Sequence, residues 1–211
     1  LALCVWPVAE LGAQEVPAVL PKLLEPTEEA ALALSAGPPS IHEGAAVYVL
    51  GPTGLQLELE GTNGFTCFVD RAVGDVTVLA PTCLNEEASA TVLPVKLVQA
   101  RMMMRGATPS EISAHIDRGY GDGTFRVPDE LALGYMFSSD QFLGAEVGRW
   151  RPHVMIYAPY LADEDVGGDP ERSEFPFVAF NPGAPLATTI IVTTEFVRPE
   201  DVPARRTEGR P

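Results

Sequence analysis

The sequence contains few basic residues. Lys and Arg together number 14, against 29 Asp and Glu, so the formal net charge is −15. A field of this sign repels phosphate backbones and anionic membrane surfaces. We therefore expect no nucleic-acid partner, and the partners that remain are a small molecule or another protein.

Long hydrophobic runs are also missing. No stretch approaches the roughly 20 apolar residues that span a bilayer, so no membrane span is predicted. Residues 1–14 form a shorter apolar segment that ends near Gly12 and Ala13. This pattern is typical of the back half of a secretory signal peptide whose Met and basic start are missing. An N-terminal strand or a truncated fragment is the alternative. The signal interpretation predicts a secreted or periplasmic bacterial protein.

Cysteine is scarce, with three residues in the chain. Cys4 falls in the predicted signal segment, which leaves Cys67 and Cys83 in the mature chain. In an oxidising compartment such a pair is most simply a disulfide. Closing that loop stabilises a fold by about 3 kcal/mol in the chain-entropy model. Two buried free thiols, or two thiolates bound to a metal, are the alternatives.

The rest of the chain is organised as one domain. With 211 residues it is long enough for one domain and short for two. Residues 15–26 hold three prolines and are expected to be an extended lead-in. The domain covers residues 27–197. Residues 198–211 are rich in proline and charge, and we expect a disordered tail there.

Helix and strand signals come in blocks, with the helices expected at residues 28–36, 85–105 and 109–118. Pro94 should kink or split the second helix, and a capping box of Thr108 and Glu111 starts the third. Strands are expected at residues 45–50, 55–60, 65–69, 131–137, 153–158, 177–180 and 188–197. In the second of these strands Leu55, Leu57 and Leu59 alternate with polar residues, so we expect all three to face one core.

Hairpins joined in this order predict an α+β fold, a single antiparallel sheet with helices packed on one face. The order of elements resembles the profilin-like or PAS-like topology. A split β-barrel is the alternative.

The first candidate site lies at the start of a predicted strand. Arg149 and Arg151 precede His153 and Tyr157, which share one face of that strand. In an acidic protein two arginines beside a histidine can hold an anionic group. These four residues are therefore predicted to form the polar end of a ligand pocket. The alternative is that His153 is a hydrogen-bonded core or rim residue and that Tyr157 packs in the interior.

The second candidate is the acidic loop of residues 163–174. Aligned with an EF-hand calcium loop, it places Asp163, Asp165, Asp169 and Glu174 at ligand positions. Gly167 stands where a further ligand side chain belongs, and extended chain flanks the loop in place of helices. The pattern supports at most a lone calcium-binding loop. The simpler interpretation is a solvated acidic loop, and no cofactor other than calcium is suggested.

Motifs of catalysis are absent from the sequence. There is no nucleophile elbow, phosphate-binding glycine loop, zinc-protease motif or paired Cys-x-x-Cys. The leading hypothesis is therefore an exported domain that binds a small molecule or a partner, without catalysis, in a pocket between sheet and helices. A hydrolase-type or metal-assisted enzyme that uses His153 is the first alternative. A structural envelope protein is the second.

Two blocks of sequence look familiar together. Residues 61–67, with Asn63, Gly64, Phe65 and Cys67, are followed by residues 81–85, with Cys83 and Asn85. With the later block at 152–159, they resemble uncharacterised bacterial exported proteins, over about half of the chain. Those proteins usually carry an acidic residue where Asn85 stands. The resemblance implies the two-cysteine framework and export, and it implies no known activity.

Overall fold

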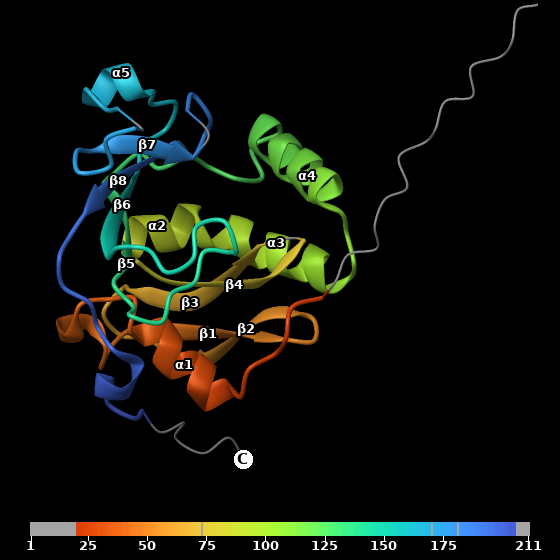
Figure 1. The fold of residues 1–211 in the computed structure, drawn as a ribbon. Coiled ribbons are helices and arrows are strands. Elements are labelled where there is room, and N and C mark those ends of the chain that lie inside the picture. Colours follow the sequence, from red (N-terminus) through yellow and green to blue (C-terminus); the bar gives the residue numbers. More distant parts are fainter. Residues whose placement is uncertain (1–19, 73, 170, 181, 206–211) are drawn as a thin grey trace, which may run out of the picture.

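The computed structural model describes residues 20–205, apart from residues 73, 170 and 181 (Figure 1). The predicted signal peptide, the first part of the lead-in and the end of the tail lie outside the described residues. The strands are β1 (Ala46–Gly51), β2 (Gly54–Leu59), β3 (Thr66–Ala72), β4 (Asp75–Leu84), β5 (Ala132–Met136), β6 (His153–Tyr157), β7 (Phe177–Phe180) and β8 (Thr188–Val192). The helices are α1 (Pro26–Leu34), α2 (Glu86–Thr91), α3 (Leu93–Met104), α4 (Pro109–Gly121) and α5 (Asp163–Val166), with short 3₁₀ turns η1 (Pro39–Ile41) and η2 (Pro199–Asp201).

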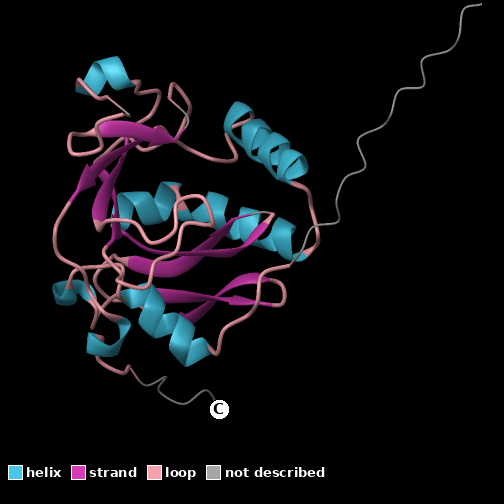
Figure 2. Cartoon of the chain, in the orientation of Figure 1, coloured by secondary structure: helices cyan, strands magenta, loops and turns pink. Residues whose placement is uncertain are grey.

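The strands form one open sheet in the order β2-β1-β3-β4-β5-β6-β8-β7. In Figure 2, β1 to β4 lie across the view, whereas β5, β6 and β8 run upward at its left, so the sheet bends strongly between β4 and β5. The predicted α+β fold with a single sheet is confirmed. Because β2 and β7 stand at the two edges, the sheet does not close into a barrel, and the split-barrel alternative is set aside.

One pair of strands is parallel in this otherwise antiparallel sheet. Ala46 and Val47 of β1 pair in parallel with Thr66 and Cys67 of β3. The reason is topological. β3 follows the β1–β2 hairpin and adds to the free side of β1, so it runs in the same direction as β1.

Helices cover both faces of the sheet, which differs from the expected single face. Neighbouring residues of a strand point to opposite faces, and Cys67 packs in a cluster with α1, whereas Phe68 packs in a second cluster with α2 and α3. Figure 1 shows α1 below β1, and α2 with α3 on the other side of the strands. The sheet therefore has two cores, because its central strands are apolar on both faces.

The three leucines of β2 do not share one core. The register between β1 and β2 shifts between Val47 and Tyr48, which inserts an extra residue into β2. A bulge of this kind reverses the face on which the following side chains lie. Leu59 therefore packs in the cluster with α1, and Leu55 packs in the cluster with α3.

The longest strand, β4, is absent from the sequence prediction. Its first half carries β-forming residues, but Pro81 inside the run argues against a central strand. In the structure Pro81 pairs with Val69 of β3. On its other side β4 pairs with β5 at Cys83 and Leu84 alone, so Pro81 lies beyond the end of that ladder.

The predicted helix boundaries hold where capping residues define them. Pro94 splits the helix expected at 85–105 into α2 and α3, and Asn85 caps the first half. The capping box of Thr108 and Glu111 is present at the start of α4. Among the described residues, no helix is long and apolar enough to cross a membrane.

The segment 198–205 is ordered, contrary to the predicted disordered tail. Val202, which follows η2, packs against the cluster that holds α1. Arg205 donates hydrogen bonds to the backbone carbonyls of His42, Ala45 and Glu60. The composition of the tail did not reveal this attachment, because the packing partners lie at the other end of the chain.

Candidate functional site

The two cysteines form a disulfide, as predicted. Cys67 of β3 and Cys83 of β4 are directly opposed in the sheet, and the sulfurs are bonded. Both residues are fully buried. The Sγ atom of Cys83 lies 3.4 Å from the carbonyl oxygen of Ala33 in α1. The disulfide is therefore a staple inside the core, out of reach of a substrate.

The sequence block around Asn63 supports the start of β3. Its Nδ2 donates to the carbonyl of Ile41 at 2.9 Å, and its Oδ1 accepts from the amide of Phe65 at 3.1 Å. Gly61 lies so close to β1 that a Cβ there would stand 2.4 Å from the amide nitrogen of Ala46. These residues hold the strands beside the disulfide in register, which is a structural role.

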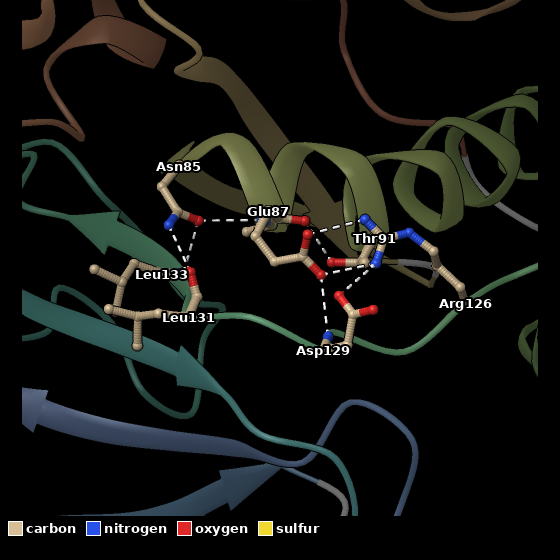
Figure 3. A network of polar contacts seen from close by, with 8 residues as sticks. Asn85, Glu87, Thr91, Arg126, Asp129, Leu131 and Leu133 are labelled. Atoms are coloured by element: carbon tan, nitrogen blue, oxygen red, sulfur yellow. Dashed lines mark hydrogen bonds and ion pairs between the residues drawn. The ribbon is translucent and has the colours of Figure 1, made fainter.

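Asn85 joins the second block to the rest of the sheet (Figure 3). Its Oδ1 accepts from the amides of Ala88 in α2 and Leu133 in β5, at 3.1 and 2.9 Å. Its Nδ2 donates to the carbonyl of Leu131 at 2.7 Å. One side chain thus caps a helix and ties that helix to the next strand, and both of its polar atoms are engaged in these contacts.

Glu87, in the first turn of α2, continues this network. Arg126 binds both carboxylate oxygens of Glu87, each at 2.9 Å, and the amide of Asp129 donates to one of them (Figure 3). The Arg126 guanidinium and these backbone donors hold the pKa of Glu87 below its ordinary value. This bidentate pair fixes the segment that leads from α4 into β5.

His153 and Tyr157 lie in the core. They point to the inner face of β6, with 1% and 8% of their surface exposed. Nδ1 of His153 stands 2.8 Å from the carbonyl oxygen of Arg151, and its ring lies edge-on to Trp150. Burial lowers the pKa of His153, so the neutral ring donates from Nδ1 to that carbonyl. No carboxylate among the described residues forms a hydrogen bond with His153.

Arg149 and Arg151 lie outside this core. Both are exposed, and Arg151 donates to the carbonyl and hydroxyl oxygens of Ser173 at 3.1 and 2.6 Å. The structure therefore separates the four predicted pocket residues into a buried pair and an exposed pair. The alternation of β6 explains the division, because the strand turns its histidine and tyrosine inward while the arginines precede it.

The acidic loop uses its carboxylates locally. Asp163 accepts from the amide of Val178 at 2.8 Å, and Asp165 accepts from the amide of Ala162 at 2.9 Å. The two other predicted ligands, Asp169 and Glu174, are likewise engaged within the loop, with the amide of Glu171 and the side chain of Arg172. Within the described residues, no group of three or more acidic, His or Cys side chains is placed to hold a metal.

The space between the sheet and α3 is closed. A small void there, lined by Arg71, Gln99 and Met103 among others, has no room for a water molecule. Arg71 instead reaches the α1 side of the sheet, where its guanidinium lies 3.3 Å from the carboxylate of Glu29. Both side chains are almost fully buried, and burial raises the pKa of Glu29. This pair belongs to the core.

An open cavity lies elsewhere, in the angle between α3 and α4. It has a volume of about 570 Å³ and is lined by Met102, Arg105, Gly106, Ala107, Glu111, Ala114 and Arg118. We call it the α3–α4 groove. Gly106 makes the turn between the helices with φ +81°, a conformation that favours glycine. This site is not apparent in the sequence, because its residues come from two helices and carry no motif.

Comparison with known proteins gives no further assignment. No protein-family model, no curated protein and no solved structure matches the chain.

Proposed function

We propose that the protein is exported and that its domain binds a small molecule, without covalent chemistry, in the α3–α4 groove. The observation that carries this proposal is the cavity of about 570 Å³, which is open to solvent and joins charged side chains to an apolar surface. Pockets for small ligands are commonly of this size. The disulfide supports export, because disulfides persist in oxidising compartments.

Binding is favoured over catalysis by the state of the polar side chains. The histidine on which the enzyme alternative depends, His153, is buried and bonded to a backbone carbonyl. A general base has to reach its substrate within hydrogen-bond distance. In the groove the ionisable residues are Arg105, Glu111 and Arg118, and an arginine stays protonated at neutral pH. These three charged side chains are suited to recognising a ligand.

The test is a fragment screen read by amide chemical shifts of the labelled protein, followed by a variant that fills the groove. Ala114→Trp places an indole in the cavity from an exposed position of α4. The matched control, Ser113→Trp, adds the same side chain at the neighbouring exposed position, which does not line the groove. We expect fragments that shift residues 102–118 to lose binding in the first variant and to keep it in the second. Fragments that bind elsewhere, or that bind both variants equally, would refute the assignment.

A further inference from the structure

We infer that the α3–α4 groove selects an organic anion, with a carboxylate or phosphate head held by Arg105 and Arg118 and an apolar body against Met102, Ala107 and Ala114. This inference rests on the proposed function and names the class of ligand.

The charge of the groove is unbalanced, with two arginines against one glutamate. Arg71, Arg126 and Arg172 each form an ion pair with a carboxylate. Arg105 and Arg118 are exposed, and neither has an ion-pair partner among the residues that the structure describes. In a protein with a net charge of −15, carboxylates are abundant, yet two guanidinium groups line this cavity against the single carboxylate of Glu111. A ligand can supply the missing anion.

Glu111 is the acidic residue in the lining of the groove. The carboxylate of Glu111 accepts hydrogen bonds from the amide and the hydroxyl of Thr108, at 2.9 and 3.1 Å. These donors hold the pKa of Glu111 below its ordinary value. The Oε2 atom of Glu111 is therefore engaged in the cap of α4, and among the described residues Glu111 forms no ion pair with Arg105 or Arg118, so the donors of both guanidinium groups are left to the ligand.

The two arginines also suit an oxyanion by their geometry. A guanidinium presents its donors in a planar fork that matches the two oxygens of a carboxylate or phosphate. Arg105 lies at the end of α3 and Arg118 in the last turn of α4, and both line the cavity. A neutral ligand would leave both without a charged partner.

The groove also has an apolar part, which would contact the body of the ligand. Met102, Ala107 and Ala114 line the same cavity with side chains that offer no hydrogen bond. An inorganic ion would not contact much of this surface, whereas an aromatic or aliphatic body removes it from water. The groove thus fits an oxyanion attached to an apolar group.

The experiment is titration calorimetry with four probes of matched size or charge. Phenyl phosphate and benzoate carry both predicted parts, benzamide lacks the charge, and inorganic phosphate lacks the body. We expect the two organic anions to bind at least about tenfold more tightly than benzamide and phosphate, a difference of about 1.4 kcal/mol. The double variant Arg105→Gln/Arg118→Gln should lose that advantage. Arg149→Gln, which removes an exposed arginine outside the groove, should keep it.

The outcomes separate the two proposals. If benzamide binds in the groove as tightly as benzoate, or if the double variant keeps full affinity for the anions, the charge selection is refuted while ligand binding in the groove stands. If phosphate binds as tightly as phenyl phosphate, the apolar body is refuted. If none of the four probes binds in the groove and the fragment screen also gives no binder there, both proposals fail.

Discussion

Breaking the disulfide should lower stability without abolishing the fold. The bond joins residues 16 positions apart in sequence, and in the chain-entropy model a loop of that length contributes about 3 kcal/mol. For a chain of this size that loss corresponds to a fall in Tm of about 6–12 °C. The two packed clusters on either face of the sheet remain, so we expect the reduced protein to unfold cooperatively at the lower temperature.

A double variant separates the cross-link from the packing of the sulfurs. Cys67→Ala/Cys83→Ala removes the bond and also leaves two small cavities in a region that is fully buried. Each cavity of about that size costs about 1 kcal/mol. We therefore expect the variant to be less stable than the reduced wild-type protein, and both to be less stable than the oxidised protein, by circular-dichroism melts with and without reductant.

The burial of the disulfide leads to a second prediction, which concerns the rate at which it is reduced. Because both sulfurs are covered by α1, a reductant should attack them only through transient opening of the core. Reduction in native buffer should therefore be slow and should accelerate in denaturant, as followed by mass after thiol alkylation. Rapid reduction in native buffer, or melts of the three forms within about 2 °C of one another, would refute the reasoning.

Three further substitutions test other parts of the structure. The lowered pKa of His153 means that the unfolded chain binds this proton more readily than the folded one, so stability should fall as pH drops below about 6.5. In urea unfolding at pH 7.5 and 5.5, His153→Gln should reduce that loss, whereas His115→Gln, at an exposed position, should not. Asn85→Ala removes a cap and a bridge to the sheet and should cost about 1–2 kcal/mol, and Asn85→Asp should cost less because it keeps the acceptor; equal losses would contradict this. Gly37→Ala places a Cβ 2.5 Å from a core side chain and should cost about 1–3 kcal/mol, while Gly121→Ala meets open space and should be close to neutral in a thermal melt.

Local signals in the sequence predicted local structure well. The capping box at Thr108, the break at Pro94 and the hairpin ending in β2 are each specified by neighbouring residues, and each is present. The disulfide also followed from the cysteine count and the expected compartment. The capping box, the break and the hairpin turn need no knowledge of the rest of the chain, because the interactions that produce them span a few residues.

Features that depend on distant partners were missed. The strand β4 was not predicted because it contains Pro81. Whether a strand tolerates a proline depends on where the neighbouring strand ends. The bulge that separates Leu55 from Leu59 depends on the register with β1. The order of 198–205 depends on α1 and on carbonyls of residues 42–60. In each case the information lies in the packing and not in the local pattern.

The same distinction explains why the predicted ligand residues and the groove do not coincide. His153 stands out in the sequence because two arginines precede it. The alternation of β6 nevertheless places its side chain in the core, where Nδ1 is hydrogen-bonded to a backbone carbonyl. Arg105 and Arg118 look ordinary on two separate helices, and they gain significance only because the turn at Gly106 places them on one cavity. Asn63 and Asn85, which belong to the two recognisable sequence blocks, stabilise the fold. Residues that lie close together in the sequence commonly form turns and helix caps. A binding site assembled across a turn between helices leaves no such trace, so its residues have to be found from unpaired charge and open space.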